Sequence, residues 1–418
     1  MLGEVFLLGL NYWPRRKAMY WWKEFDEGEV EEEFKEVRSL GAEVVRFFLL
    51  WEDFQPRPDV VDDGALANLE AVLDLAHRYG LKTMPTLLVG HMSGANWVPE
   101  WALDEAHRSP YPVISGGKLV PYGVRDIYED PAMLEAERLL VRTVASTFSE
   151  HLAVLAWDLS NEVDNLRVPR SPEAAKRWCA LLANEIRSVD PNHPVTLGLH
   201  QEDLEFDKGF HVHELDLDMV SMHGYPMVAP WAEGPLDTDA VPFLNTLTEA
   251  LVGRPVLFQE FGLPTAPPGE GRVEIGRAKI YKKDVRLYLF SEEEAGRYYE
   301  EVLVKLHRLG SLGALAWCFS DYDPCVWQKP PLDRNVAERF FGLTRSDGSL
   351  KPMGEAFKRF AKKERPVLRC PIKLEMPGED YYLRPYENLV AAYREFKRAL
   401  RLGCEHHNDA YVPGLMTC

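Results

Sequence analysis

The stretch Glu29–Leu50, EVEEEFKEVRSLGAEVVRFFLL, contains the pattern that decides the fold. Its first part, Glu29–Leu40, combines acidic residues with apolar residues at helical spacing, and Gly41 is typical of the position just after a helix. Its second part, Glu43–Leu50, is a short apolar run of the kind that forms a strand buried on both faces. The stretch therefore predicts a helix followed by a buried parallel strand.

The same unit recurs along the chain. Short apolar runs separated by mostly helical segments are typical of parallel strands with helices on both faces. The eight runs are Val5–Leu10, Glu43–Leu50, Leu81–Val89, Ala153–Leu159, Val195–Leu199, Asp218–Met222, Pro255–Phe258 and Leu312–Phe319. Further segments with helical spacing are Ala65–Tyr79, Pro131–Ser149, Pro172–Val189, Thr238–Leu251 and Glu292–Leu309. A strand–helix unit repeated eight times predicts an α/β protein built as a (β/α)8 TIM barrel.

A doubly wound open sheet is the alternative, but such sheets usually have fewer strands and a glycine-rich first turn. Here the first run leads into Gly9-Leu10-Asn11-Tyr12-Trp13, which is not a G-x-G-x-x-G motif. We predict that residues 1–363 form the catalytic barrel and that residues 364–418 are a small C-terminal appendage of unknown role. Within the appendage, Pro366–Met376 is predicted to form one or two strands and Arg384–Leu402 a helix.

The composition limits the kinds of partner. The chain has 48 Lys and Arg against 66 Asp and Glu, a net charge of −18, which argues against nucleic acid and against an anionic membrane. It has no run of about 18 apolar residues, so no transmembrane helix is predicted. Eleven Trp and 17 Tyr supply flat apolar faces of the kind on which sugar rings pack. The expected ligand is therefore a neutral or cationic small molecule or a neutral polymer.

The sequence also bears on compartment, disulfides and metals. The first residues show neither a basic region nor a small-residue cleavage site, so we expect no signal peptide and a cytoplasmic location. Six Cys are too scattered for a disulfide framework. Cys404, His406 and His407 lie together, but no second ligand pair stands at a useful spacing, so a solvated tail is predicted there rather than a metal site. The oligomeric state stays open.

Polar residues gather where the predicted strands end, which is where the active site of such a barrel lies. Two carboxylates stand out: Glu162 follows the fourth run in WDLSNE, and Glu260 follows the seventh in VLFQEFG. Their strands lie on opposite sides of the ring, so the carboxylates can face each other. A pair about 5–5.5 Å apart hydrolyses an acetal with retained configuration. Mutual repulsion is expected to raise the pKa of one carboxyl and to keep it protonated near neutral pH.

The arrangement resembles clan A glycoside hydrolases, and most closely glycoside hydrolase family five, over roughly residues 5–363. The residues that match the family's motifs are Arg46 in VVRFF, His91, the pair Asn161-Glu162, His223-Gly224-Tyr225, Glu260, and Trp317 in AWCF. The resemblance implies that Glu162 is the acid/base and Glu260 the nucleophile. This double displacement needs no metal or organic cofactor.

Chemistry suggests roles for the other matching residues. Arg46 would hold Glu260 ionised, and Tyr225 could donate a hydrogen bond to the same carboxylate. Asn161 would bind the sugar 2-hydroxyl, and Trp317 would form the floor under the sugar ring. His223 could contact Glu162 or the leaving-group side. For His91, a role in the site and a purely structural role in the core are equally expected. Five further candidates either line the cleft or pack the core: Trp13, Trp51, Glu52, Trp97 and Trp101. His200 is expected to be structural.

The substrate is suggested by a less specific likeness. The segments Trp51–Phe54, Asp321–Trp327, Pro330–Asp333 and Glu338–Leu343 resemble intracellular β-mannosidase-like members of the family. We therefore expect a retaining enzyme that cleaves β-mannosidic bonds in mannan-derived oligosaccharides, as an exo-acting β-mannosidase rather than an endo-acting β-mannanase. The long segment 90–130 could close the cleft into the pocket that exo action requires. The alternatives are the same chemistry on β-1,4-glucosides and, remotely, a non-catalytic carbohydrate-binding barrel.

Overall fold

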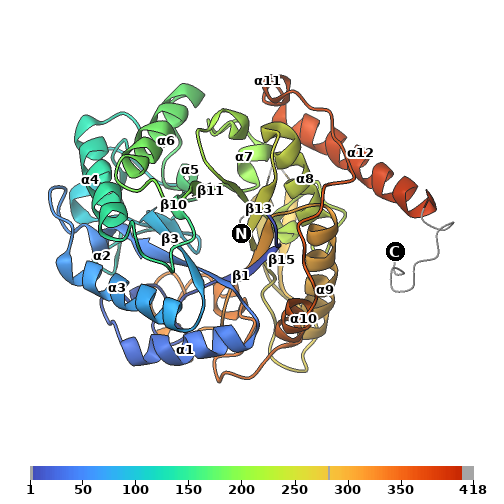
Figure 1. Cartoon of the computed structure of the whole chain (residues 1–418), viewed down its shortest axis with the longest axis horizontal. Helices are drawn as coiled ribbons and strands as arrows, with labels where there is room; N and C mark the ends of the chain where they lie inside the picture. The colour runs from blue at the N-terminus through green and yellow to red at the C-terminus, as the bar shows by residue number, and fades with distance from the viewer. Residues whose placement is uncertain (1–2, 281–282, 407–418) are drawn as a thin grey trace.

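The computed structural model describes residues 3–280 and 283–406, without the side chains of 403–406. It confirms the predicted TIM barrel: eight parallel strands form a ring that helices surround (Figure 1). The strands of the ring are β1 (Leu7–Asn11), β2 (Val44–Leu50), β3 (Lys82–Val89), β10 (Trp157–Asn161), β11 (Val195–Gly198), β12 (Val220–His223), β13 (Val256–Phe261) and β16 (Gly313–Ala316). Each of the eight predicted apolar runs overlaps one of them.

The strands pair in the order β11-β10-β3-β2-β1-β16-β13-β12. The two outer strands of this order meet as well, because His200 and His223 form a parallel bridge and the His223 amide donates to the Leu199 carbonyl at 2.8 Å. This contact closes the sheet into a barrel. The alternative of an open doubly wound sheet is therefore wrong.

Two apolar layers stabilise the barrel. A small cluster inside the ring contains residues of β2, β3, β13 and β16 and residues that precede β10 and β12: Val44, Met84, Ala156, Met219, Leu257 and Leu315. It fills the end of the barrel at which the strands begin, as layered side chains do in this fold. The much larger second cluster packs the outer face of the strands against the helices. The opposite end of the ring is left to polar residues.

The helices of the barrel region are α1 (Glu27–Ser39), α2 (Trp51–Phe54), α3 (Asp63–Arg78), α4 (Pro131–Thr147), α5 (Val163–Leu166), α6 (Pro172–Arg187), α7 (Glu202–Glu205), α8 (Ala240–Val252), α9 (Glu292–Arg308) and α10 (Pro352–Ala361). Local sequence sets where several of them begin. Asp26 and Asp62 accept hydrogen bonds from the first amides of α1 and α3, and Ser291 with Glu294 forms a capping box on α9. Across the described residues, no helix has both the length and the apolar character that crossing a bilayer demands.

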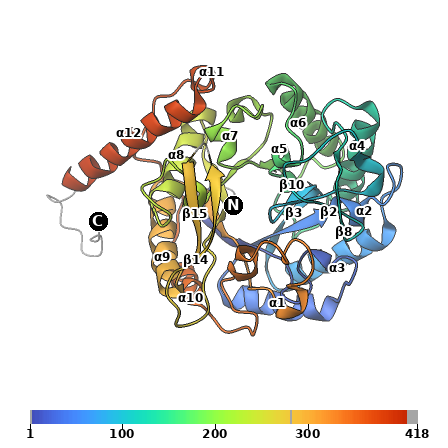
Figure 2. The same cartoon turned by 180° about the vertical axis from the view of Figure 1, so that it is seen from behind.

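Two inserted segments lie at the end of the barrel at which the strands finish. Residues 90–130 form short strands: β4 (His91–Met92), β5 (Ala95–Trp97), β6 (Leu103–Asp104), β7 (Val113–Ser115), β8 (Lys118–Val120) and β9 (Gly123–Val124). After β13, the antiparallel strands β14 (Val273–Ile280) and β15 (Lys283–Leu289) pair with each other outside the ring. Figure 2 shows this pair and the loop after β16 on the same face of the molecule.

The C-terminal segment packs on one side of the barrel (Figure 1). Its helices are α11 (Gly378–Tyr381) and α12 (Pro385–His406), so the predicted helix is confirmed. The predicted strands in Pro366–Met376 are wrong, because within that range only Pro366 forms a β-bridge, to Val5. Pro366 and Pro371 lack the amide hydrogen that a strand ladder needs. The division at residue 363 stays a prediction, since α11 and α12 bury apolar residues in the same core as the barrel.

Candidate active site

The strands that carry the site share a local irregularity. The pairing register shifts near the C-terminal ends of β10, β12 and β13, each time just before or at a site residue, and β2 has a similar shift between Phe48 and Leu50. A regular strand alternates its side chains between two faces, whereas a bulge re-aims them. As a result, Gln259 and Glu260 both contact residues inside the barrel although they are neighbours in sequence.

Glu260 is held by a fully buried arginine. Arg46 Nη1 donates to Glu260 Oε1 at 2.5 Å, and Tyr225 Oη donates to Glu260 Oε2 at 2.9 Å. The same guanidinium donates through Nη2 to Asn161 Oδ1 at 2.9 Å and through Nε to Asp158 Oδ2 at 2.9 Å. Both oxygens of Glu260 are therefore fixed in place, one by a cationic donor and one by a hydroxyl. These contacts bring together four of the predicted residues.

The sequence analysis missed two residues of this network. Asp158 is fully buried in β10 and shares the charge of Arg46 with Glu260. Gln259 donates to Asp158 through Nε2 at 3.2 Å, and its Oε1 lies 3.0 Å from His223 Nε2. Because that amide oxygen can only accept, His223 carries a proton on Nε2. The available sequence signal for Asp158 was an acidic residue within an apolar strand, which needs a cationic partner such as Arg46 inside the barrel.

Glu162 lies directly after β10 in an unusual conformation. Its backbone is left-handed, with φ of 43° and ψ of 52°, which is strained for a residue with a side chain. Its Oε1 lies 3.0 Å from His223 Nδ1, and Asn165 Nδ2 donates to Oε2 at 3.3 Å. His223 can therefore share a proton with Glu162 through Nδ1 while its Nε2 stays on Gln259. The predicted contact between His223 and Glu162 is thus present.

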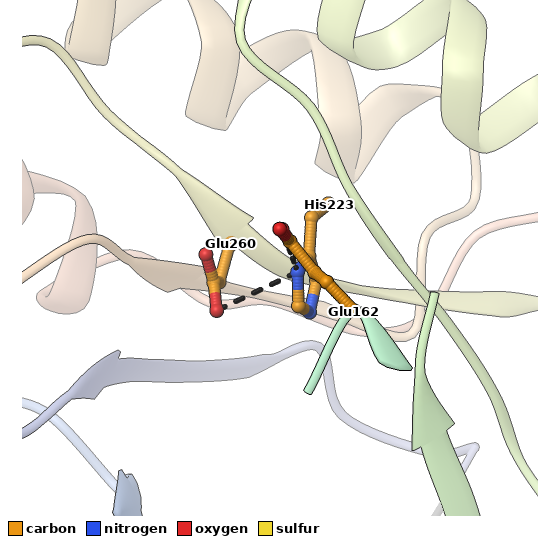
Figure 3. A group of neighbouring side chains, drawn as sticks. All are labelled: Glu162, His223 and Glu260. Atoms are coloured by element: carbon orange, nitrogen blue, oxygen red, sulfur yellow. Dashed lines mark hydrogen bonds and ion pairs between the residues drawn. The ribbon is translucent and has the colours of Figure 1, made fainter. Parts of the chain in front are cut away.

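Glu162 and Glu260 face each other across His223. One oxygen of each carboxylate and a nitrogen of His223 all lie within 4.8 Å of one another. Figure 3 shows His223 between the two carboxylates, with interactions to both. An inverting pair is usually about 6.5–9.5 Å apart because a water must fit between sugar and base, whereas a retaining pair is about 5–5.5 Å apart. The spacing between Glu162 and Glu260 therefore corresponds to the shorter separation of a retaining pair.

Three histidines surround the Glu162 carboxylate. His200 Nδ1 lies 3.8 Å and His91 Nε2 4.0 Å from Glu162 Oε2, in addition to His223 on Oε1. Burial raises the pKa of Glu162, but the charge of His200 and the hydrogen bond with His223 outweigh burial and leave it below its ordinary value. The expectation that repulsion raises the pKa of one carboxyl is therefore wrong for Glu162, because these histidines compensate the negative charge.

His91 and Asn161 are fixed by the insertion at residues 90–130. His91 Nδ1 donates to Asn96 Oδ1 at 2.6 Å, because the Asn96 amide nitrogen is occupied by Ser109 Oγ and the Asn165 carbonyl. Asn161 Nδ2 donates to the His91 carbonyl at 3.1 Å. Burial lowers the pKa of His91. The first residues of the insertion thus position two predicted site residues.

The predicted aromatic residues divide into two groups. Trp317 lies edge-on to Phe48, and Trp13 stacks on the same ring at 5.0 Å between centroids, so both lie near Arg46. Trp51, by contrast, is fully buried and donates to Gln55 Oε1 at 2.7 Å, away from the carboxylate pair. Glu52 accepts a hydrogen bond from the Gly116 amide at 2.7 Å and one from Lys23. The structure thus gives Glu52 a contact to the insertion.

Two groups of side chains have the spacing to hold a metal ion among the described residues: Glu162, His223 and Glu260, and the buried Asp164, His200 and Asp203. In each group a cationic side chain already pairs with a carboxylate, Arg46 with Glu260 and Lys208 with Asp164. The arrangement therefore suits acid–base chemistry better than metal binding. The side chains of Cys404, His406 and His407 lie outside the described residues.

Comparison with known proteins identifies relatives of this chain. The model of the Cellulase family (glycosyl hydrolase family 5) matches residues 7–275. Mannan endo-1,4-beta-mannosidase A of Hypocrea jecorina is 24% identical in an alignment of 277 positions that covers 57% of this chain and 56% of the relative. A putative mannan endo-1,4-beta-mannosidase 9 of Oryza sativa subsp. japonica is 24% identical over 54% of this chain and 60% of its own length. The chain thus spans a little over half the length of these curated relatives.

Solved structures share the fold. The exo-beta-1,4-mannosidase Op5Man5 from Opitutaceae bacterium strain TAV5 is 26% identical with a TM-score of 0.70, over 86% of this chain and 61% of that chain. A GH5_18 structure from Streptomyces cattleya in complex with GlcNAc has a TM-score of 0.77 at 21% identity, over 98% of this chain and 95% of that chain. Because the family model covers well over half of the 418 residues, the chain belongs to glycosyl hydrolase family 5.

Proposed function

We propose that this protein is a retaining β-mannosidase that removes mannose from the non-reducing end of short β-mannosidic oligosaccharides. The observation that carries the proposal is the carboxylate pair. Glu260 is held by Arg46 and Tyr225, Glu162 is held by His223, and the two carboxylates approach within 4.8 Å. Two carboxylates in such different surroundings can take different roles.

In the first step of the proposed reaction, Glu260 attacks the anomeric carbon and forms a covalent glycosyl–enzyme ester. Protonated Glu162 donates its proton to the glycosidic oxygen as the bond to the leaving group breaks. Arg46 and Tyr225 orient Glu260 for this attack through hydrogen bonds to both of its oxygens. Asn161 has one amide hydrogen on the His91 carbonyl, and its second amide hydrogen can bind the sugar 2-hydroxyl.

In the second step, Glu162 is ionised and acts as a base. It takes a proton from water as the water oxygen attacks the anomeric carbon and the ester bond to Glu260 breaks. The histidines around Glu162 favour its ionised form and so support this step. Two inversions at one carbon leave the product with the configuration of the substrate.

The choice of a mannoside rests on the relatives. The curated relatives are named mannan endo-1,4-beta-mannosidases, and the Opitutaceae structure is named an exo-beta-1,4-mannosidase. A further structure from Streptomyces cattleya, with a TM-score of 0.74 over 95% of this chain, holds Manβ1-4GlcNAc. That disaccharide is therefore a second substrate worth testing beside mannan oligosaccharides.

The choice of exo action rests on the loops. The insertion after β3 and the loop after β16 meet, since Asn335 Nδ2 donates to the Ser93 carbonyl at 3.4 Å. Residues of both, including Gly94, Ile114 and Pro331, line a partly open hollow of about 170 Å³ between them. Tyr20 Oη adds a hydrogen bond to the Pro330 carbonyl at 2.5 Å. Contact between these loops favours a pocket closed on one side over an open cleft.

The test is a time course of purified protein on β-1,4-mannotetraose and on Manβ1-4GlcNAc, with products separated by chromatography. Mannose and mannotriose as the first products of the tetraose are expected. Mannobiose as the main early product would instead indicate an endo-acting mannanase. Turnover of β-1,4-glucotetraose without turnover of either mannoside would overturn the proposed substrate. The double variant Glu162→Gln/Glu260→Gln, prepared in parallel, controls for contaminating hydrolases.

A further inference from the structure

Behind Glu162 lies a second buried charged group. His200, which follows β11, has Nε2 2.8 Å from Asp164 Oδ1 and Nδ1 3.8 Å from Glu162 Oε2. Lys208 Nζ lies 3.1 Å from Asp164 Oδ2. His200 is 5% exposed and Asp164 is 3% exposed, so water screens their charges little. The His200 ring therefore bridges an aspartate and the proposed acid/base.

Every element packed around His200 contributes to its charge state. From α5 come Asp164 and, just before that helix, Glu162, while α7 supplies Asp203, whose Oδ2 accepts from the His200 amide at 2.9 Å. Burial lowers the pKa of His200, but the negative charges of Asp164 and Glu162 raise it well above its ordinary value. Lys208 neutralises part of Asp164 and is itself paired with Glu202. The surroundings thus favour a protonated ring.

The groups that face Glu162 come from four directions. His91 is in β4, His223 ends β12, Glu260 is in β13, and His200 approaches from the loop after β11. Among the three histidines, His223 is oriented by a neutral amide, Gln259, and His91 by a neutral amide, Asn96. Only His200 of these three has a carboxylate on its far nitrogen. It is therefore the histidine best suited to carry a lasting positive charge beside Glu162.

We propose that His200, held by Asp164, is a positioning residue that sets the protonation equilibrium of Glu162. Nδ1–H of the His200 cation faces Glu162 Oε2, the oxygen that His223 does not contact. This cation favours the ionised form of Glu162, which serves the base step and makes the acid step depend on acidic pH. The inference rests on the proposed function, in which Glu162 is the acid/base.

The kinetic test is the pH profile of kcat/KM, which reports the ionisation of groups in the free enzyme. The acid step needs protonated Glu162, so activity falls as pH rises through the pKa of that residue. In His200→Gln the cation is gone, and the alkaline limb should move up by about 1–3 pH units, the usual effect of an opposite charge at this distance. Asp164→Asn should move it in the same direction, because His200 then loses the partner that keeps it charged.

A matched control is His151→Gln. His151 also pairs with an aspartate, Asp74, at 3.2 Å, but it precedes β10 and so lies at the opposite end of the barrel from Glu162. The alkaline limb of the pH profile of His151→Gln should coincide with that of the wild type. If His200→Gln lowers kcat/KM equally at every pH and leaves the limb in place, His200 is merely structural and the inference is wrong.

A second measurement needs no substrate. The carboxyl carbon of Glu162 can be followed by NMR in protein labelled with 13C at glutamate side chains, with the resonance assigned by its loss in Glu162→Gln. The midpoint of its titration should rise in His200→Gln and in Asp164→Asn, and stay unchanged in His151→Gln. An unchanged midpoint in both site variants would overturn the inference even if the protein cleaves no mannoside. A raised midpoint in an inactive protein would refute only the proposed function.

Discussion

Arg46 is the residue on which the largest number of site contacts depends. Its guanidinium binds Glu260, Asp158 and Asn161 at once, in a place that water does not reach. Lysine has the same charge but a single ammonium group, so it cannot satisfy three partners in a fixed plane. Removing one partner from a buried ion pair typically costs about 3–5 kcal/mol.

We therefore predict that Arg46→Lys lowers kcat/KM by at least about 100-fold and also lowers the free energy of unfolding by a few kcal/mol. Steady-state kinetics and urea denaturation measure the two effects. Arg187→Lys is the control, since Arg187 binds Asp216 and Asp218 at the surface, remote from the barrel interior. Wild-type kinetics in Arg46→Lys would show that Glu260 does not need this partner.

The two glutamates should respond differently to removal of their charge. Glu260→Gln removes the nucleophile and should reduce turnover of all substrates by several orders of magnitude. Glu162→Gln should cost about 10²–10⁴-fold on a natural glycoside but much less on an aryl β-mannoside, whose leaving group departs without a proton. Added azide should restore turnover of the aryl substrate in Glu162→Gln and yield a glycosyl azide. A glycosyl azide of retained configuration from Glu260→Gln, together with one of inverted configuration from Glu162→Gln, would reverse the two roles.

At this scale the sequence analysis identified residues near the ends of the strands and Arg46 within β2, but it missed Asp158 and Gln259. Glu162 and Glu260 could be predicted from the sequence because each follows an apolar run. Gln259 was not, because strict alternation places it on the face opposite to Glu260, and only the bulge brings both into the barrel. The contact of His200 with Asp164 was not predictable, because Asp164 belongs to a different loop and sequence spacing does not show it.

At the scale of elements, the insertion after β3 decides between pocket and cleft. The turn between β7 and β8 is tied to the barrel by Glu52, whose Oε2 accepts from the Gly116 amide. We predict that Glu52→Ala loosens this turn and increases the fraction of mannobiose released from mannohexaose. Glu52→Gln keeps an oxygen acceptor for the amide and should behave nearly as the wild type. Identical product patterns for Glu52→Ala and the wild type would mean that the insertion does not limit the cleft.

The strands of the ring were predictable because burial on both faces requires continuous apolar runs. The hairpin of β14 and β15 was missed although its signal is present: Val273, Ile275, Ala278 and Ile280 alternate with polar residues in most of β14. The segment Pro366–Met376 shows the opposite error, since its apolar residues suggested strands but its prolines prevent a ladder. Apolar content alone was therefore a poor guide outside the barrel.

At the scale of the whole molecule, buried carboxyls make stability depend on pH. Burial raises the pKa of Glu33 to about 7 and that of Glu205 to about 8. A carboxyl whose pKa is higher in the folded than in the unfolded state binds its proton more tightly when folded. Its contribution is fully present below the unfolded pKa and is lost as pH rises through the folded pKa. The net charge of −18 adds repulsion in the same direction.

We therefore predict that the free energy of unfolding falls between about pH 5 and pH 8. Glu205→Gln should reduce this fall, because glutamine cannot ionise and can still accept from Trp231 Nε1, which lies 2.6 Å from Glu205 Oε1. Urea denaturation at both pH values measures the difference. Glu105→Gln, at an exposed position, should leave the pH dependence unchanged. A free energy of unfolding that rises toward pH 8 in the wild type would contradict the raised pKa values of these buried carboxyls.

The C-terminal segment also acts at this scale, because it packs on the part of the chain that carries His200. Tyr381 Oη donates to the Leu204 carbonyl at 2.6 Å, and the ring of Tyr382 stacks on His211 at 3.9 Å. The segment thus supports α7 and the residues that follow it. Sequence analysis predicted the helix in this region but could not predict the surface on which it packs.

The central claim is that Glu162 and Glu260 perform a double displacement on a β-mannoside. The measurement that tests it most directly is proton NMR of the mannose released from an aryl β-mannoside, whose leaving group is not a sugar, recorded before the mannose equilibrates between its anomers. With the carboxylates within 4.8 Å of each other, we predict that the β-anomer forms first and that the α-anomer follows only by spontaneous mutarotation. Initial release of the α-anomer would mean a single displacement by water and would contradict the account.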